Sequence, residues 1–484
     1  MSRTWLLLPL LLLYLYNLGG AGFGLDPDEP RYAAIGREMA HSGDWVTPHL
    51  NGSPWYEKPP LLYWMTAAAT KVGLRDEWAA RLPVALLSLA FLAFLYTIVE
   101  REFSGRTAMM ATALLGTSAG WIGYSFVAVT DLPVAVTFNA AMLLALFDTR
   151  PRRGRPGGKL PVTAGWIAGA LLGLAILAKA FLPAALFLPV WLVARGKRLA
   201  IVAGAVLVAA PWHVLMSLRH GHAFWDVYFW QQQVGRFNSA ALQHGEPFWF
   251  YLAVLPLGLF PWTPLFALLA RKKTYADVRV SSLAIWIGLA LVFLSAFANK
   301  LPGYLLSLLP AMAIVLAIAL EKAPAQEWWI AGCVLLLALA PSIAGVLPDA
   351  LLAGFTHAHW PLQLGGLPFA LVAAAGTWWL AWRKQPALAL LAGALAAAIA
   401  AAYLKTAVLP VLDRRVAVRS FYRANQAEMN GAMKDVCLDS SLRPKQVYAL
   451  EYYADRKLPE CLAQPAKFHV ISNQEGLALV SKTP

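Results

Sequence analysis

Residues 79–99 read AARLPVALLSLAFLAFLYTIV, an apolar stretch long enough to cross a membrane as a helix, which takes about 20 residues. Runs of this kind recur along the whole 484-residue chain. We count thirteen of them: 4–21, 79–99, 107–125, 132–148, 163–179, 181–195, 199–217, 249–269, 280–297, 303–320, 328–346, 363–382 and 386–404. The pattern predicts an all-α polytopic membrane protein with thirteen transmembrane helices.

The composition excludes two other large classes of protein. Hydrophobic residues make up 59% and charged residues 14% of the chain, whereas soluble domains have about 45–50% and about 25%. A water-soluble globule would lack the polar surface to cover itself, and a disordered chain needs the opposite balance. The net charge of +14 has two explanations: an anionic partner, or the lysines and arginines that anchor cytoplasmic loops.

The basic residues also set the orientation, because cytoplasmic loops are enriched in lysine and arginine. With Arg3 in the cytoplasm and alternating spans, the basic clusters fall inside, at 101–106, 150–159, 195–198, 271–279, 322 and 383–384. Two long loops, 22–78 and 218–248, then lie outside. We therefore expect a transmembrane domain, 1–404, and a C-terminal domain, 405–484, on the outer face.

The C-terminal tail is polar and small. Its pattern predicts a helix over 415–436 and short strands near 446–453 and 467–480, which together indicate a small α/β domain. If the tail lies in an oxidising compartment, Cys437 and Cys461 can form a disulfide that stabilises so small a fold.

The densest polar cluster, DPDEPRY, follows the first span. Asp26 can cap a helix that continues to His41, with a proline at its first position. Asp28, Glu29 and Arg31 then project from a helix start at the membrane surface. A capping turn with surface charges is one interpretation, but three carboxylates exceed what capping needs and favour a site.

Two further motifs lie on the same side of the membrane. In the sequence EKPP, Lys58 stands just before a helix expected over 61–72. The positive end of that helix disfavours a lysine unless an anion is bound, although a lysine reaching toward lipid phosphates is an equal alternative. Asp131, in the sequence TDLP, either caps the next span or belongs to a site.

Several basic residues lie outside, against the positive-inside trend: Lys179, Arg219, Arg236 and Lys300, the last within the motif NKLPGY that ends at Tyr304. Together with Arg31 and Lys58 they indicate a pocket for a phosphate at the outer leaflet. His244 and Glu57 could hold a divalent metal, but two ligands so far apart are a weak signal, and a solvated histidine is the alternative.

In order, DEPRYAAIGREM, SGDWVTPHLNG, YEKPPLLYW, TDLP, LAKAFL, APWH and NKLPGY resemble the motifs of bacterial lipid A aminoarabinose transferases. These belong to the protein O-mannosyltransferase-like, GT-C superfamily of glycosyltransferases. The resemblance covers roughly residues 20–320. It implies transfer of a sugar, with inversion, from undecaprenyl phosphate to a membrane-embedded acceptor at the periplasmic face. The sugar and acceptor implied are 4-amino-4-deoxy-L-arabinose and a lipid A phosphate.

The resemblance also assigns roles to residues. The catalytic carboxylates it implies are Asp28, with its neighbour Glu29, and Asp131. Donor-phosphate ligands are Lys58, Arg31 and Tyr304, to which the charge pattern adds Lys300 and Lys179. Glu57 and His244 match a divalent-metal site, for zinc or for magnesium or manganese.

We accordingly expect a monomer in the bacterial inner membrane, with a cytoplasmic N-terminus and no nucleotide cofactor or nucleic-acid partner. Three alternatives remain at this point. The chain could transfer another sugar to a different envelope glycan or protein. It could be a ligase or polymerase of surface polysaccharide. It could also be a transporter or flippase of a lipid-linked sugar, a class in which polar residues at mid-membrane and internal repeats are typical.

Overall fold

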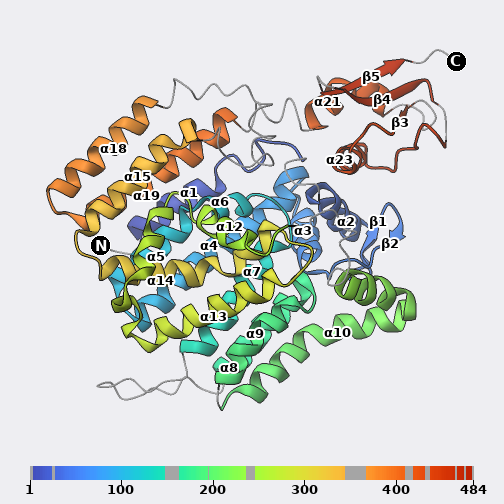
Figure 1. Cartoon of the computed structure of the whole chain (residues 1–484). Coiled ribbons are helices and arrows are strands. Elements are labelled where there is room, and N and C mark those ends of the chain that lie inside the picture. The colour runs from blue at the N-terminus through green and yellow to red at the C-terminus, as the bar shows by residue number, and fades with distance from the viewer. Residues whose placement is uncertain are drawn as a thin grey trace.

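The helices of the chain are arranged around a central apolar core, as Figure 1 shows. This computed structural model describes residues 4–23, 28–147, 163–194, 196–235, 246–343, 367–408, 418–430, 436–463, 466–473 and 476–481. Within these residues, the apolar helices up to residue 225 are α1 (Thr4–Leu15), α4 (Asp76–Glu102), α5 (Gly105–Gly116), α6 (Ala119–Ser125), α7 (Asp131–Phe147), α8 (Thr163–Lys179), α9 (Leu182–Val193) and α10 (Arg198–Trp225).

The later part of the bundle contains both α-helices and shorter helical turns. Its elements are α12 (Phe250–Gly258), η2 (Thr263–Ala270), η3 (Lys272–Ala276), α13 (Val278–Ser295), η4 (Pro302–Ser307), α14 (Leu309–Glu321), α15 (Gln326–Ile343), α18 (Leu367–Trp382), α19 (Pro386–Tyr403) and η6 (Leu404–Val408). Every predicted span therefore contains helix. In Figure 1, α15, α18 and α19 form a separate group at one side of the bundle, where they pack against one another.

Three predicted spans are divided between two helices. Residues 107–125 form α5 and α6, 249–269 form α12 and η2, and 303–320 form η4 and α14. The pair α12 and η2 is bent by 118°. Among the described residues, four helical segments are long and apolar enough to cross a membrane by themselves: Asp76–Glu102, Arg198–Gly235, Val278–Ser295 and Pro386–Thr406. The protein is thus a multi-pass membrane protein, as the composition predicts.

The break between α5 and α6 has a clear packing reason. The amide of Ala119 donates to the Phe260 carbonyl, 2.8 Å away. A Cβ atom on Gly120 would come within 2.8 Å of the Gly258 carbonyl oxygen. The missing side chain of Gly120 therefore lets α6 approach α12 at backbone contact, which a continuous apolar run does not reveal.

The loop predicted between the first two spans folds into two helices and a short hairpin: α2 (Glu29–Ser42), β1 (His49–Leu50), β2 (Ser53–Pro54) and α3 (Leu61–Lys71). These helices confirm the two expected in this loop, although α2 has Asp28 as its N-cap and Asp26 lies outside the described residues. Near its end, α10 is kinked at Gly221, whose φ is +54°. The chain then continues into η1 (Asp226–Gly235). Figure 1 places this end of α10 beside β1, β2 and α3.

The C-terminal residues contain α21 (Val418–Ala424), α22 (Gln426–Met429), β3 (Val436–Leu438), α23 (Pro444–Ala454), β4 (Phe468–Asn473) and β5 (Gly476–Ser481). The sheet has the order β3-β4-β5, with β3 and β4 parallel and β4 and β5 antiparallel. Helix α23 forms the crossover between the two parallel strands. Figure 1 shows this sheet at one end of the molecule, and α23 packs on α2.

The strand predicted near 446–453 is wrong, because this segment is the helix α23. Its tyrosines and valine favour strands as single residues. Helix formation is favoured by Pro444 in the first turn and by Gln446, whose Oε1 accepts a hydrogen bond from the Arg443 amide at 2.8 Å. The local signals at the helix start therefore outweigh the propensities of the residues that follow.

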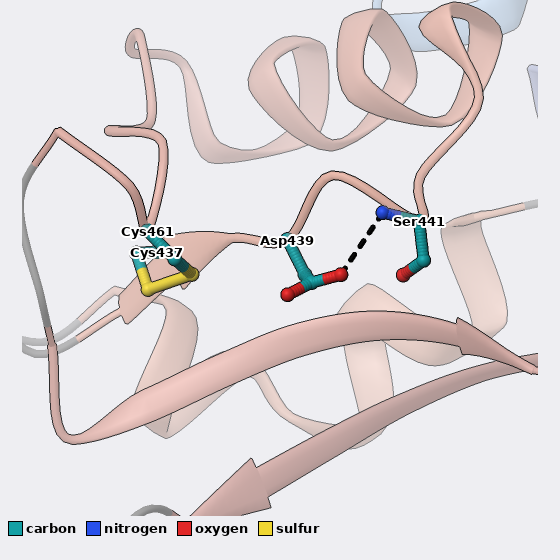
Figure 2. The surroundings of a disulfide bond; sticks show 4 residues. All are labelled: Cys437, Asp439, Ser441 and Cys461. Atoms are coloured by element: carbon teal, nitrogen blue, oxygen red, sulfur yellow. Dashed lines mark hydrogen bonds between the residues drawn. A yellow bond between two sulfur atoms is a disulfide. The ribbon is translucent and has the colours of Figure 1, made fainter.

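Cys437 and Cys461 are joined in a disulfide, shown in Figure 2. It links β3 to the segment that follows α23, across a sequence separation of 24 residues. Close by, the Ser441 amide donates to Asp439 Oδ1 at 2.9 Å, in the turn that leads from β3 toward α23. The disulfide therefore closes the crossover of the small sheet.

Substituting both cysteines by serine should destabilise the C-terminal residues by about 3 kcal/mol, because a loop of this length loses its constraint on the unfolded state. Limited proteolysis of the purified protein, followed by mass spectrometry, measures this loss: the variant should be cleaved faster than the wild type at sites C-terminal to residue 405. In the unreduced wild-type protein, Cys437 and Cys461 should resist alkylation. Rapid alkylation of either of these two cysteines without a reductant would contradict the pairing.

Candidate active site

Asp28 stands at the N-terminus of α2 with its side chain turned to its own helix. Its carboxylate accepts from Arg31 Nη2 at 2.5 Å and from the Tyr32 hydroxyl at 3.1 Å. It makes no capping bond to the backbone. Its side chain is 43% exposed, so a carboxylate held in a fixed direction is accessible from outside the protein.

Glu29, the next residue, lies in the opposite environment. It is completely buried and accepts two hydrogen bonds from the Arg81 guanidinium, at 2.7 and 2.8 Å. The amide of Ala128 donates to the same carboxylate at 2.9 Å. Arg81 also donates to backbone carbonyls of the segment before α2: Leu18, Ala21 and Gly22. The geometry therefore argues against the catalytic role expected for Glu29 and gives it a positioning role instead.

Arg31 is largely enclosed, with 14% of its side chain exposed. Beyond Asp28, its nearest acid is Glu57, whose Oε2 lies 3.9 Å from Nη1. Its Cζ atom is 4.9 Å from the ring centroid of Trp55, and the rings of Tyr32 and Tyr448 are 5.4 and 5.3 Å away. Burial opposes its charge, but these tyrosines and the two carboxylates outweigh burial and raise the pKa of the guanidinium.

Lys58 is buried just ahead of α3, which begins at Leu61 as the two prolines predict. The loop that carries it is fastened to the end of α10. His220 bonds through Nε2 to the Thr47 hydroxyl at 2.9 Å and through Nδ1 to the Tyr56 hydroxyl at 3.1 Å. Arg219 donates twice to Asp44, at 2.8 and 3.0 Å. Together, Asp28, Arg31 and Glu57 form what we call the α2 cluster, and Lys58 follows Glu57 directly in the chain.

A second group of polar residues, the α7 cluster, consists of Asp131, Lys179 and Tyr304. Lys179 Nζ lies 2.5 Å from Asp131 Oδ1, and 4.4 Å from the centroid of the Tyr304 ring. Lys179 and Tyr304 also line a small hollow, whose other walls are mostly apolar: Val134, Leu182, Pro183, Leu186, Gly303 and Ser307.

Gly303 allows the α7 cluster to form. A Cβ atom at this position would lie 2.2 Å from Asp131 Oδ1 and 2.7 Å from its Cγ. The Asp131 carboxylate therefore occupies the space where any other residue at 303 would place a side chain. The structure brings together residues from α7, α8 and η4 that are far apart in sequence.

Lys300 does not join either cluster. Its ammonium is buried and donates to the carbonyls of Glu246 and Phe297, at 3.0 and 2.7 Å. These bonds hold the segment before α12 against the end of α13, which argues against the phosphate role expected for Lys300. His244 and Arg236 lie outside the described residues.

The expected metal site rests on Glu57 in the part of the chain that the structure describes. Glu57 is near Arg31, whose positive charge competes with a cation for the same carboxylate. Across the described residues, a group of three metal-type ligands is found at Cys437, Cys461 and His469, where the two cysteines form the disulfide. A metal at Glu57 and His244 therefore stays a prediction.

Sequence reasoning missed two residues beside the α2 cluster: Arg81, which binds Glu29, and Tyr448, whose ring contacts Arg31. Arg81 was counted within an apolar span, although an arginine in such a span is expensive and signals a buried partner. Tyr448 comes from the C-terminal residues, 417 positions after Arg31, and no local motif connects the two. Only the fold brings them to the site.

Comparison with known proteins defines the class first. ArnT from Cupriavidus metallidurans, in the crystal structure bound to undecaprenyl phosphate, has a TM-score of 0.76 at 21% identity, over 97% of this chain and 94% of that chain. An oligosaccharyltransferase from Archaeoglobus fulgidus has a TM-score of 0.50 at 16% identity, over 96% and 65%. The chain therefore shares the fold of this ArnT structure.

Sequence comparison then gives the family. Residues 3–218 match the family of dolichyl-phosphate-mannose-protein mannosyltransferases. An undecaprenyl phosphate-alpha-4-amino-4-deoxy-L-arabinose arabinosyl transferase of Pseudomonas aeruginosa (strain UCBPP-PA14) is 32% identical over 343 residues, 66% of this chain and 61% of the relative. A second, from Pseudomonas fluorescens (strain Pf0-1), is 32% identical over 66% and 60%. The match thus spans about three fifths of these relatives. The chain is thus similar to these arabinosyl transferases over 66% of its own length.

Replacing Glu29 by alanine should lower the free energy of unfolding by about 3–5 kcal/mol, because it leaves Arg81 buried without its carboxylate. Thermal unfolding in detergent measures the loss. Glu38→Ala is the matched control on the same helix, since Glu38 accepts an exposed hydrogen bond from the Gly52 amide at 2.9 Å. We expect a cost below about 1 kcal/mol there. A Glu29 variant that is fully stable yet inactive would restore the catalytic assignment.

Replacing Gly303 by alanine should displace the Asp131 carboxylate and separate it from Lys179. A displacement of about 1 Å at a reacting centre can cost about 10²-fold in rate, so we expect a loss of that order in sugar transfer. Gly123→Ala is the control, because a Cβ there meets no atom within 4 Å. Equal activity of the two variants would remove the α7 cluster from the site.

Proposed function

We propose that this protein transfers 4-amino-4-deoxy-L-arabinose from undecaprenyl phosphate to a phosphate of lipid A. The observation that carries the proposal is the α2 cluster, an accessible carboxylate fixed to an enclosed arginine, in a chain similar to these transferases. The named relatives are transferases of this sugar. The structural neighbour at TM-score 0.76 was crystallised with undecaprenyl phosphate.

The topology that fits this reaction has thirteen spans, a cytoplasmic N-terminus and a periplasmic C-terminal domain, 405–484, in the bacterial inner membrane. Three arguments support it: the helices at every predicted span, the alternation of basic loops, and the disulfide between Cys437 and Cys461. Disulfides persist in the oxidising periplasm and are rare in the cytosol. Both polar clusters then belong to the outer face.

In this mechanism the polyprenyl phosphate is the leaving group. It leaves as an anion, so the reaction requires no general acid, and stabilisation of the departing charge becomes the main task. Arg31, Lys58, Lys179 and Tyr304 are the residues that we assign to the donor phosphate. These four side chains come from α2, from the loop just before α3, from the end of α8 and from η4.

The role of Asp28 depends on the acceptor. A hydroxyl acceptor needs a general base within hydrogen-bond reach, which the exposed Asp28 carboxylate can provide. A lipid A phosphate is already anionic and needs no base. For that acceptor, Asp28 orients the incoming group or stabilises positive charge on the sugar, and Asp131 has the same chemistry available in the α7 cluster. Attack from the face opposite the leaving phosphate inverts the anomeric centre.

A phosphate that binds Arg31 also competes with Asp28 for the guanidinium. In the structure Asp28 holds Nη2, and Nε of Arg31 has no hydrogen-bond partner among the described residues. This buried N–H is a donor that the fold leaves for another group, and a phosphate oxygen satisfies it. Binding of the sugar-donor phosphate and release of the Asp28 carboxylate are therefore linked through the Arg31 side chain.

The test is mass spectrometry of lipid A from bacteria that lack the protein, complemented with the wild type or with Asp28→Asn. The wild type should add one aminoarabinose to a lipid A phosphate. The variant should accumulate to the same level in the membrane and reduce the product by about 10³-fold, since transition-state charge stabilisation is lost. Unmodified lipid A with the wild type, alongside a new sugar on another envelope glycan, would overturn this choice of acceptor.

A further inference from the structure

Helix α23 of the C-terminal residues is held tightly against α2. Arg37 donates to the Tyr452 carbonyl at 2.8 Å and pairs with Asp455 at 2.8 Å. The guanidinium of Arg37 also lies 4.0 Å from the centroid of the Tyr452 ring. Asn51, next to β1, donates to Glu451 at 3.0 Å. These contacts fix both the position and the rotation of α23.

A second set of bonds ties α23 to the membrane bundle. The Tyr453 hydroxyl donates to Glu77 at 2.5 Å and accepts from the Phe23 amide at 2.9 Å. Glu77 lies in the first turn of α4, where Arg419 of α21 also reaches it at 3.3 Å. The C-terminal residues are therefore anchored to the same helix, α4, that holds Glu29 through Arg81.

This docking places Tyr448 at the α2 cluster. Tyr448 precedes Tyr452 by four residues, so the two side chains share one face of the helix. Its ring centroid is 5.3 Å from Arg31 Cζ, within the range of a cation–π contact. Residues 3–218, which match the mannosyltransferase family, do not include this position.

We propose that Tyr448 is a positioning residue of the donor-phosphate site, through which the C-terminal domain holds Arg31 for the phosphate; this rests on the proposed function. The rings of Tyr448 and Trp55 restrict the rotamers of Arg31 and cover part of its guanidinium. They do so without using any of its N–H groups, because a ring face accepts the charge of a cation and not a directed hydrogen bond. The guanidinium donors stay available for the phosphate.

The first test measures binding of undecaprenyl phosphate to the full-length protein in detergent, by native mass spectrometry. Tyr448→Leu should weaken the affinity about tenfold, because it removes a partly desolvated cation–π contact. Tyr448→Phe keeps the ring and should stay within about twofold of the wild type. Equal affinities of the leucine variant and the wild type would overturn the inference.

A double-variant cycle separates this role from a general structural one. In an Arg31→Lys background the same leucine substitution should cost less than about twofold, since the planar guanidinium that the ring holds is gone. Additive losses in the two backgrounds would show that Tyr448 does not act through Arg31. If the leucine variant lowers the melting temperature, Tyr448→Met provides a second substitution of similar volume.

Transfer kinetics distinguish failure of this inference from failure of the proposed function. In the leucine variant the donor KM should rise about tenfold, while kcat at saturating donor falls by less than about threefold, as expected for lost ground-state binding. A wild-type protein that binds the lipid but transfers no sugar would refute the proposed function and leave the binding test of Tyr448 intact. Unchanged donor KM in an active leucine variant would refute the role of Tyr448 alone.

Discussion

The buried ion pair between Glu29 and Arg81 is the contact on which the site depends. A charge removed from water is stable only when it is paired and its remaining hydrogen-bonding positions are filled. Arg81 meets this condition with three carbonyls besides Glu29, and Glu29 meets it with the Ala128 amide. One pair thus joins α4, the end of the first span, the start of α2 and the segment that leads to Asp131. The adjacent residue, Asp28, can face outward because Glu29 faces inward.

The charges of the two polar clusters are arranged in pairs. Arg31 with Asp28, and Lys179 with Asp131, are each in direct contact. Such pairing keeps cations in an apolar protein stable before an anionic ligand arrives. It also means that a phosphate has to compete with a carboxylate at each cation. In the proposed reaction, the affinity for the phosphate then depends on how much more strongly the cation binds the phosphate than the carboxylate. A carboxylate displaced in this way becomes available next to the bond that breaks.

Several parts of this arrangement follow from local sequence. The prolines before Leu61 and the acidic run before α2 mark helix starts, and apolar length identifies the spans. The hydrogen-bond and ion-pair partners that lie far apart along the chain cannot be predicted from local sequence. Glu29 looks like a second catalytic acid until Arg81 is seen beside it, and Lys300 looks like a phosphate ligand until its carbonyl partners are known. The α23 segment contains tyrosines and a valine, which favour strands, but also Pro444 in its first turn, which favours a helix start.

The C-terminal residues contribute by restricting Arg31. An arginine side chain has many rotamers, and fixing one of them costs about 2 kcal/mol of conformational entropy. Asp28 supplies direction, but a single ion pair with a half-exposed carboxylate is weak in water. Aromatic rings from β2's neighbour Trp55 and from Tyr448 lower the local dielectric around the pair and strengthen it. The disulfide and the Arg37 contacts keep α23 rigid enough to hold its ring there. A small domain far along the chain therefore sets the electrostatics of a site whose charged residues all lie near the other end.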